Sequence, residues 1–176
     1  MAASWQRAAA LAQTIALENF QLDPTSNIHG VPHWDRVAKN ARLLVSRMES
    51  GASLDICMWF AYLHDCMRDT DHDDPQHGQR AASLATDVWT AGRLPLNVED
   101  FELLRIALAD HSAGYTTGHL LMRICWDADR LDLPRVGTMP EPAKMCTTVG
   151  RKLAQIMTPP KTDRGALVSP QYRRPR

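Results

Sequence analysis

Residues 54–65, LDICMWFAYLHD, combine an almost unbroken apolar run with a charged end. Cys57, Phe60, Ala61 and His64 are spaced i, i+3, i+4 and i+7, which is the spacing of one helix face. This places His64 toward the core. A histidine and a carboxylate side by side at the end of a buried helix are costly to desolvate unless a charged species binds both. We expect that species to be a metal ion.

Apolar residues recur at helical spacing along most of the chain, with turn residues between the segments. No useful length of alternating apolar and polar residues is present, so nothing indicates a β-strand. We expect helices near 2–19, 32–45, 54–64, 77–88, 98–110, 119–133 and 143–157. The sequence therefore predicts an all-α protein, a single-domain helical bundle of about six or seven helices.

The length and net charge of the chain indicate a single-domain protein that does not bind nucleic acid by bulk electrostatics. A chain of 176 residues fits one domain with a sizeable core. We expect that domain at 1–158 and a flexible, basic, proline-containing tail at 159–176. The 20 basic and 20 acidic residues cancel, so bulk binding of nucleic acid is not expected. Any recognition of phosphate must then be local, and the oligomeric state stays open.

Cysteine spacing and hydropathy indicate a soluble, cytoplasmic protein. The four cysteines form no CxxC pair, and reduced cysteines within apolar segments are typical of the cytoplasm. No segment approaches the roughly 20 apolar residues of a membrane helix. We therefore expect no membrane contact.

Three predicted helices carry candidate metal ligands. His33, the pair His64-Asp65 and a carboxylate of Asp127-Ala128-Asp129 can converge in a bundle core. Imidazole and carboxylate together suit Mn, Fe, Co, Ni or Zn better than calcium. The expected cofactor is a divalent transition metal.

The order of these residues resembles the His…His-Asp…Asp pattern of the HD-domain superfamily of metal-dependent phosphohydrolases. The resemblance covers roughly 29–137, and it includes H-x-x-R-V at 33–37 and Ala-Asp-Arg-Leu at 128–131. It implies an HD-like helical domain. The ligands that it implies are His33, His64, Asp65 and Asp129.

Asp127 and Asp129 compete for the last ligand position. They lie about 200° apart around a regular helix, so both cannot face one metal. The resemblance favours Asp129, because the aspartate of the family follows an alanine. Asp127 would then support the ligands, contact the substrate or serve a second metal.

His77 and His111 fall where two-metal HD proteins place additional histidine ligands. The sequence leaves open whether these histidines bind a second metal or contact the substrate. A second metal would make the site dinuclear, of the phosphodiesterase or the di-iron oxygenase kind.

The predicted chemistry is hydrolysis by metal-activated water. A divalent cation lowers the pKa of bound water from about 15.7 to about 7 and withdraws charge from a phosphoryl oxygen. Asp65 would be both a ligand and a partner of the attacking water. Three arginines lie within about one helical turn of the proposed ligands and suit phosphate binding: Arg36, Arg68 and Arg130. Arg130 has an alternative partner in Asp132 or Asp127.

The first functional hypothesis is a metal-dependent phosphohydrolase that acts on a small phosphorylated molecule, with nucleotides as the expected class. The alternative enzyme is a di-iron oxygenase of HD type, which requires His77 and His111 both to be ligands. The third hypothesis is a non-catalytic metal-binding or ligand-binding regulatory module. The completeness of the ligand set weighs against it.

Overall fold

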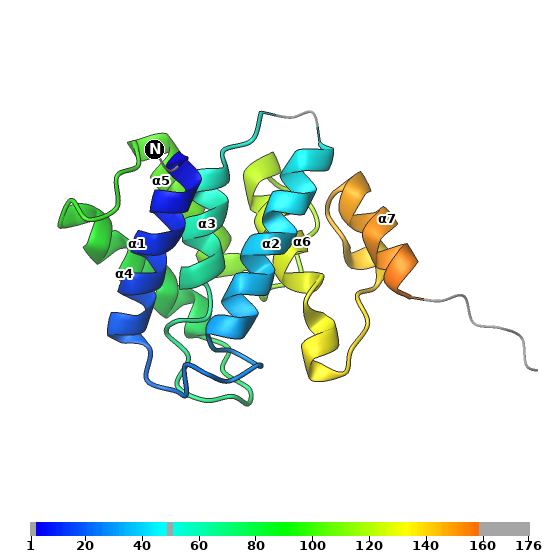
Figure 1. The fold of residues 1–176 in the computed structure, drawn as a ribbon, viewed down its shortest axis with the longest axis horizontal. Coiled ribbons are helices and arrows are strands. Elements are labelled where there is room, and N and C mark those ends of the chain that lie inside the picture. Colours follow the sequence, from blue (N-terminus) through cyan, green and yellow to red (C-terminus); the bar gives the residue numbers. More distant parts are fainter. Residues whose placement is uncertain (1–2, 49–50, 159–176) are drawn as a thin grey trace, which may run out of the picture.

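Helices make up all the regular structure in the residues that the computed structural model describes, 3–48 and 51–158 (Figure 1). The elements are α1 (Ser4–Asn19), α2 (Val31–Arg47), α3 (Leu54–Leu63), α4 (His77–Thr90), α5 (Val98–Asp110), α6 (Leu120–Arg130), α7 (Thr148–Met157) and the short 3-10 helices η1 (Leu133–Val136) and η2 (Pro142–Lys144). No strand occurs in this part of the chain, so the predicted all-α class is confirmed. The predicted tail at 159–176 lies outside the described residues. None of the described helices is long and apolar enough to span a membrane.

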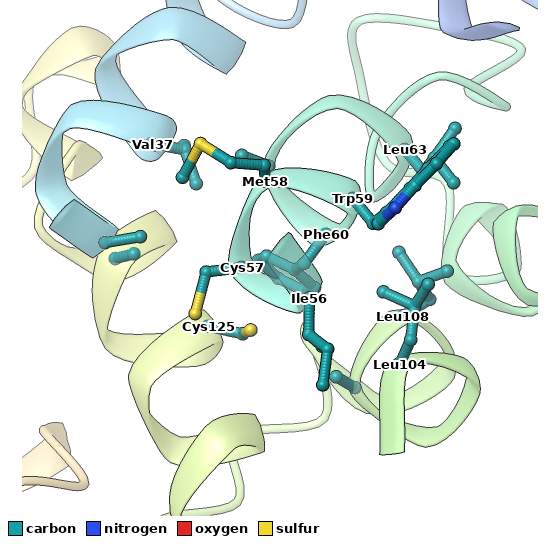
Figure 2. Close-up of a cluster of buried hydrophobic side chains, with 14 of the residues drawn as sticks. Val37, Ile56, Cys57, Met58, Trp59, Phe60, Leu63, Leu104, Leu108 and Cys125 are labelled. Carbon is teal, nitrogen blue, oxygen red and sulfur yellow. The ribbon is translucent and has the colours of Figure 1, made fainter. Parts of the chain in front are cut away.

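The helix α3 forms the centre of the bundle. Every residue from Ile56 to Leu63 is buried, and α3 packs against α1, α2, α5 and α6. In Figure 1 it lies between α1 and α2, and Figure 2 shows its Ile56 near Leu104 and Leu108 of α5. Burying a large apolar side chain contributes about 1.5–3 kcal/mol relative to leaving it exposed. A helix that is apolar on all sides therefore occupies the core.

Three of the candidate histidines lie at helix ends. His64 is the C-cap residue of α3, and His111 is the C-cap residue of α5. His77 is the first residue of α4. All three side chains are buried, so the polar site is built into the apolar core, at the points where regular helix stops.

Two predicted boundaries near the C-terminal end were wrong. The sixth helix ends at Arg130 rather than near residue 133, because the chain tightens into η1 and then turns at Gly137, whose φ is 75°. The last helix begins at Thr148 rather than near residue 143, because Thr147 caps it by accepting a hydrogen bond from the Gly150 N–H. These shifts decide the partners of Asp127 and Arg130.

Candidate metal centre

The first cluster of ligand atoms joins α2, the end of α3 and α6. His33 Nε2 lies 3.0 Å from His64 Nε2. Asp129 Oδ1 lies 3.6 Å from His33 Nε2 and 3.7 Å from His64 Nε2. All of these atoms are within 4.8 Å of one another, which is close enough to hold one metal ion. We call this group of three residues cluster 1.

The second cluster consists of Asp65, His77 and His111. His77 Nε2 lies 2.8 Å from His111 Nε2. Asp65 Oδ1 lies 3.2 Å from His77 Nε2 and 3.6 Å from His111 Nε2. We call this group cluster 2. It brings together the two histidines whose role the sequence left open.

Asp65 belongs to both clusters through its two oxygens. While Oδ1 faces cluster 2, Oδ2 lies 3.4 Å from His33 Nε2 and 3.4 Å from His64 Nε2. A single buried carboxylate therefore stands between the two candidate metal positions. Such a group can bridge two cations or serve one.

Backbone carbonyls orient three of the four histidines in the same way. The Nδ1 atoms of His64, His77 and His111 each contact the carbonyl oxygen three residues earlier in the chain. A carbonyl only accepts hydrogen bonds, so Nδ1 must carry the proton. The remaining lone pair, on Nε2, then points into the site, as a metal ligand requires.

A carboxylate orients the fourth histidine. His33 Nδ1 lies 2.7 Å from Asp132 Oδ2, and Arg36 Nε donates to Asp132 Oδ1 at 2.7 Å. Partners of this kind fix the tautomer and increase the basicity of the ligating nitrogen. Arg36 also donates to the Asn27 carbonyl oxygen. These contacts give Arg36 a role in supporting His33 through Asp132, and its contact with a phosphate stays a prediction.

The ionisation of the ligands reflects their burial and their neighbours. Burial lowers the pKa of His64. Burial would raise the pKa of Asp65, but His64, His111 and His33 hold it well below its usual range. In His111 burial is outweighed by Asp65, which raises the pKa of the imidazole. The carboxylates are thus ready to bind a cation, and a cation must displace protons from part of the histidine set.

The donor set fits a borderline divalent metal. Two pairs of inward-facing imidazole nitrogens stand 3.0 Å and 2.8 Å apart, a spacing at which two lone pairs repel unless a cation or a proton lies between them. Asp129 Oδ1 is buried and has no hydrogen-bond partner in the part of the chain that the structure describes, although buried polar atoms normally have one. Buried histidine and aspartate groups can therefore hold a metal here, with nitrogen and oxygen donors that suit Mn, Fe, Co, Ni or Zn.

Arg68 lies at cluster 2, as its position in the sequence predicted. Its Nη1 is 3.2 Å from His77 Nε2 and 3.5 Å from Asp65 Oδ1. Its Nε and Nη2 donate to the carbonyl oxygens of Thr70 and His72. The guanidinium is therefore held by the loop and presents one edge to the site.

Arg130 lies elsewhere than predicted. It donates to the carbonyl oxygens of Tyr115 and Lys144, at 2.7 Å and 2.8 Å, and to Cys146 Sγ. It pairs with neither Asp127 nor Asp132. These bonds join α6 to two loops and use the guanidinium for a structural contact, which weighs against the predicted role of Arg130 at the phosphate.

Asp127 also differs from its prediction as a substrate or second-metal residue. Its carboxylate is fully buried and accepts from the N–H groups of Cys146 and Thr147 and from the Thr147 hydroxyl, at 2.7–2.8 Å. A Cβ at Gly150 would lie 2.2 Å from Asp127 Oδ2. Asp127 therefore anchors the start of α7 on the face of α6 that points away from the metal ligands.

Two residues of the site were missed from the sequence. Asp132 lies one turn beyond Asp129, a spacing that could have suggested a shared face. Arg135, in η1, has Nη1 3.7 Å from Asp129 Oδ1 and Nη2 3.9 Å from Asp65 Oδ2. It follows a proline in an irregular turn, and no pattern in the sequence pointed to it.

A pocket gives a small molecule room beside cluster 2. Its volume is about 530 Å³, within the range of roughly 300–1,000 Å³ that is usual for ligand sites. Arg68 and His77 form part of its wall, with polar groups of Asp110 and Ser112 nearby. Cluster 2 thus borders a cavity through His77.

No family model and no curated protein matches the chain. The fold is similar to that of a crystal structure described as a predicted HD superfamily hydrolase from an uncultured Thermotogales bacterium. The two chains are 26% identical, with a TM-score of 0.64, and the match covers 83% of this chain and 82% of the other.

This similarity and the buried His/Asp clusters confirm the resemblance to the HD-domain superfamily. In a general sense they support a metal-dependent hydrolase.

Proposed function

We propose that the protein is a metal-dependent phosphohydrolase that cleaves a phosphate ester of a small molecule, with nucleotides as the first class to test. The observation that carries the proposal is Asp65. Its two oxygens face two histidine pairs, and the Arg68 guanidinium lies 3.5 Å from one of those oxygens. Sites for cations and a fixed positive side chain thus meet beside one pocket.

Each residue has a role in this reaction. His33, His64, Asp65 and Asp129 would hold the metal, with His77 and His111 as ligands of a second one. A bound divalent cation supplies a nucleophile by lowering the pKa of water, and it reduces the charge on the phosphoryl group. Asp65 accepts a hydrogen bond from the attacking water, and Arg68 binds a phosphoryl oxygen.

The experiment is a hydrolysis screen of the full chain purified without chelator. The wild-type protein, loaded in turn with Mn, Ni, Co, Zn or Fe, is assayed against nucleoside mono-, di- and triphosphates and simple phosphate monoesters and diesters. We expect metal-dependent product release that Asp65→Asn abolishes. No turnover of any phosphate ester by a fully metal-loaded protein would contradict the proposal.

A di-iron oxygenase is the second candidate, because cluster 2 brings together both histidines that this chemistry requires. It predicts two equivalents of iron and oxygen consumption that depends on an organic substrate. Phosphate ester hydrolysis with Mn, Ni, Co or Zn alone would decide against it.

A further inference from the structure

Arg135 carries a charged group that the contacts of the protein do not satisfy. Its side chain is about nine-tenths buried, at 10% relative exposure. Its Nε donates to the Ile28 carbonyl oxygen at 2.7 Å. Its Nη1 is buried and has no hydrogen-bond partner among residues 3–48 and 51–158. A buried charged donor without a partner is destabilising, so a partner from outside the chain is expected at this nitrogen.

The neighbouring carboxylates do not supply that partner. Nη1 stands 3.7 Å from Asp129 Oδ1, and Nη2 stands 3.9 Å from Asp65 Oδ2, and both distances exceed hydrogen-bond reach. Asp129 Oδ1 also lacks a hydrogen-bond partner among the described residues. Two unsatisfied groups of opposite charge therefore face the same space, and the bond to Ile28 keeps the guanidinium from closing on the carboxylate.

Arg135 and Arg68 are held alike on the two sides of Asp65. Backbone carbonyls bind Nε of Arg135, and Nε and Nη2 of Arg68. The free edge of Arg68 faces Asp65 Oδ1, and that of Arg135 faces Asp65 Oδ2. Cluster 2 thus has one guanidinium beside it, and cluster 1 has the other.

The two segments that hold these arginines are tied to each other. Ile28 precedes His29, and Thr70 and His72 flank Asp71 in the chain. His29 Nδ1 lies 2.8 Å from Asp71 Oδ1. This contact outside the metal ligands helps to hold the two guanidinium groups at a fixed separation, as a preformed anion site requires.

We propose that Arg135 binds a non-bridging oxygen of the substrate's phosphoryl group at cluster 1, opposite Arg68, so that the two arginines hold the anion from both sides of Asp65. The planar fork of arginine suits a phosphoryl group with several equivalent oxygens. This inference rests on the proposed function for its substrate, but its test does not depend on turnover.

The probe is inorganic phosphate, titrated into the metal-loaded full chain by calorimetry. Arg135→Met should weaken phosphate binding at least about tenfold, as expected for loss of a charged hydrogen bond, with the metal content unchanged. Arg135→Lys, which keeps the charge and loses the fork, should bind phosphate with intermediate affinity. Arg93→Met is the matched control, because Arg93 is exposed and paired with Glu18 at 2.8 Å; it should bind phosphate as the wild type does.

Several outcomes overturn the assignment of Arg135. One is phosphate affinity in both Arg135 variants within twofold of wild type. Another is loss of metal from Arg135→Met, which would show that Arg135 positions the carboxylates of Asp65 and Asp129 for the metal rather than binding phosphate. Failure of the wild type to bind phosphate also overturns it. If Arg135→Met does not fold, the phosphate affinity of Arg135→Lys in the same titration tests the assignment.

The assignment and the proposed function can fail separately. Phosphate binding that depends on Arg135, without hydrolysis of any ester, would leave Arg135 as an anion-binding residue and remove the phosphohydrolase. Hydrolysis with the same kcat/KM in wild type and Arg135→Lys would keep the enzyme and remove Arg135 from its site.

Discussion

Clusters 1 and 2 present similar donor atoms to a metal but differ in the groups that hold their histidine rings in place. His33 of cluster 1 is supported by the Asp132 carboxylate, which is itself bound by Arg36. In cluster 2 the Nδ1 atoms of both histidines contact neutral backbone carbonyls. An anionic partner makes the ligating nitrogen a stronger donor than a neutral one does.

The two arginines also differ in how closely they approach the ligands of each cluster. Arg68 Nη1 stands 3.2 Å from His77 Nε2 in cluster 2, where it competes with a cation for the same lone pair. Arg135 approaches cluster 1 only to 3.7 Å. We infer that cluster 1 is the tighter metal site, and that cluster 2 is the one whose occupancy varies with metal concentration.

Removal of Asp65 should have the largest effect, because it should abolish metal binding at both clusters. Because its two oxygens serve both clusters, Asp65→Ala should reduce the metal content to near zero while the helical circular dichroism persists. The loss of affinity should exceed the roughly 10–100-fold that outer partners contribute. Elemental analysis of dialysed protein measures it. Full metal occupancy in the variant would show that the ligand set is assigned wrongly.

His111→Ala should break cluster 2 alone. We expect the weaker class of metal sites to disappear, and the tighter class to change little, because cluster 1 keeps its three ligands. His64→Ala is the paired variant and should remove the tighter class instead. Metal titrations followed by calorimetry separate the two classes. Identical losses in both variants would mean that the six residues form one site.

Asp132→Asn should lower the affinity of cluster 1 by about 10–100-fold, because His33 loses an anionic partner but keeps its place. Cluster 2 does not contact Asp132 and should bind as before. Competition with a metal chelator of known affinity gives the change. Asp87→Asn, at an exposed aspartate of α4, serves as the control, and an equal effect there would contradict the prediction.

Arg68→Met should have the smallest effect, and it should have the opposite sign. Removing a positive charge beside His77 is expected to strengthen cation binding at cluster 2 several-fold, since like charges near a protein surface repel by a few kcal/mol at most. Arg105→Met is a suitable control, because Arg105 pairs with Glu102 at 2.8 Å on the outside of α5. Weaker binding of the cation after Arg68→Met would refute competition between Arg68 and the metal.

The sequence predicted the features that rest on local pattern. The apolar run before His64 predicted a buried helix, and α3 is that helix. Helical geometry separated Asp127 from Asp129 by about 200°, and the structure puts their carboxylates among different partners. Both predictions depend on spacing along one helix, which a sequence records directly.

The missed features depend on where distant segments meet. Arg135 is oriented by the carbonyl of Ile28, 107 residues away in the chain. The partners of Asp127 belong to the turn that begins α7, and the sequence placed that helix about five residues too early. Arg130 was assigned by its closeness in sequence to Asp129, but its long side chain reaches the carbonyl of Lys144 instead.

The shared carboxylate of Asp65 has a thermodynamic consequence. A cation at cluster 1 that fixes the orientation of Asp65 changes the affinity of cluster 2, and linkage requires cluster 2 to change the affinity of cluster 1 by the same factor. The identity of the ion in one position therefore influences which ion the other position selects. With both positions filled, the metal preference of the centre would be a property of the pair, and single-site affinities measured one at a time would not add up to it.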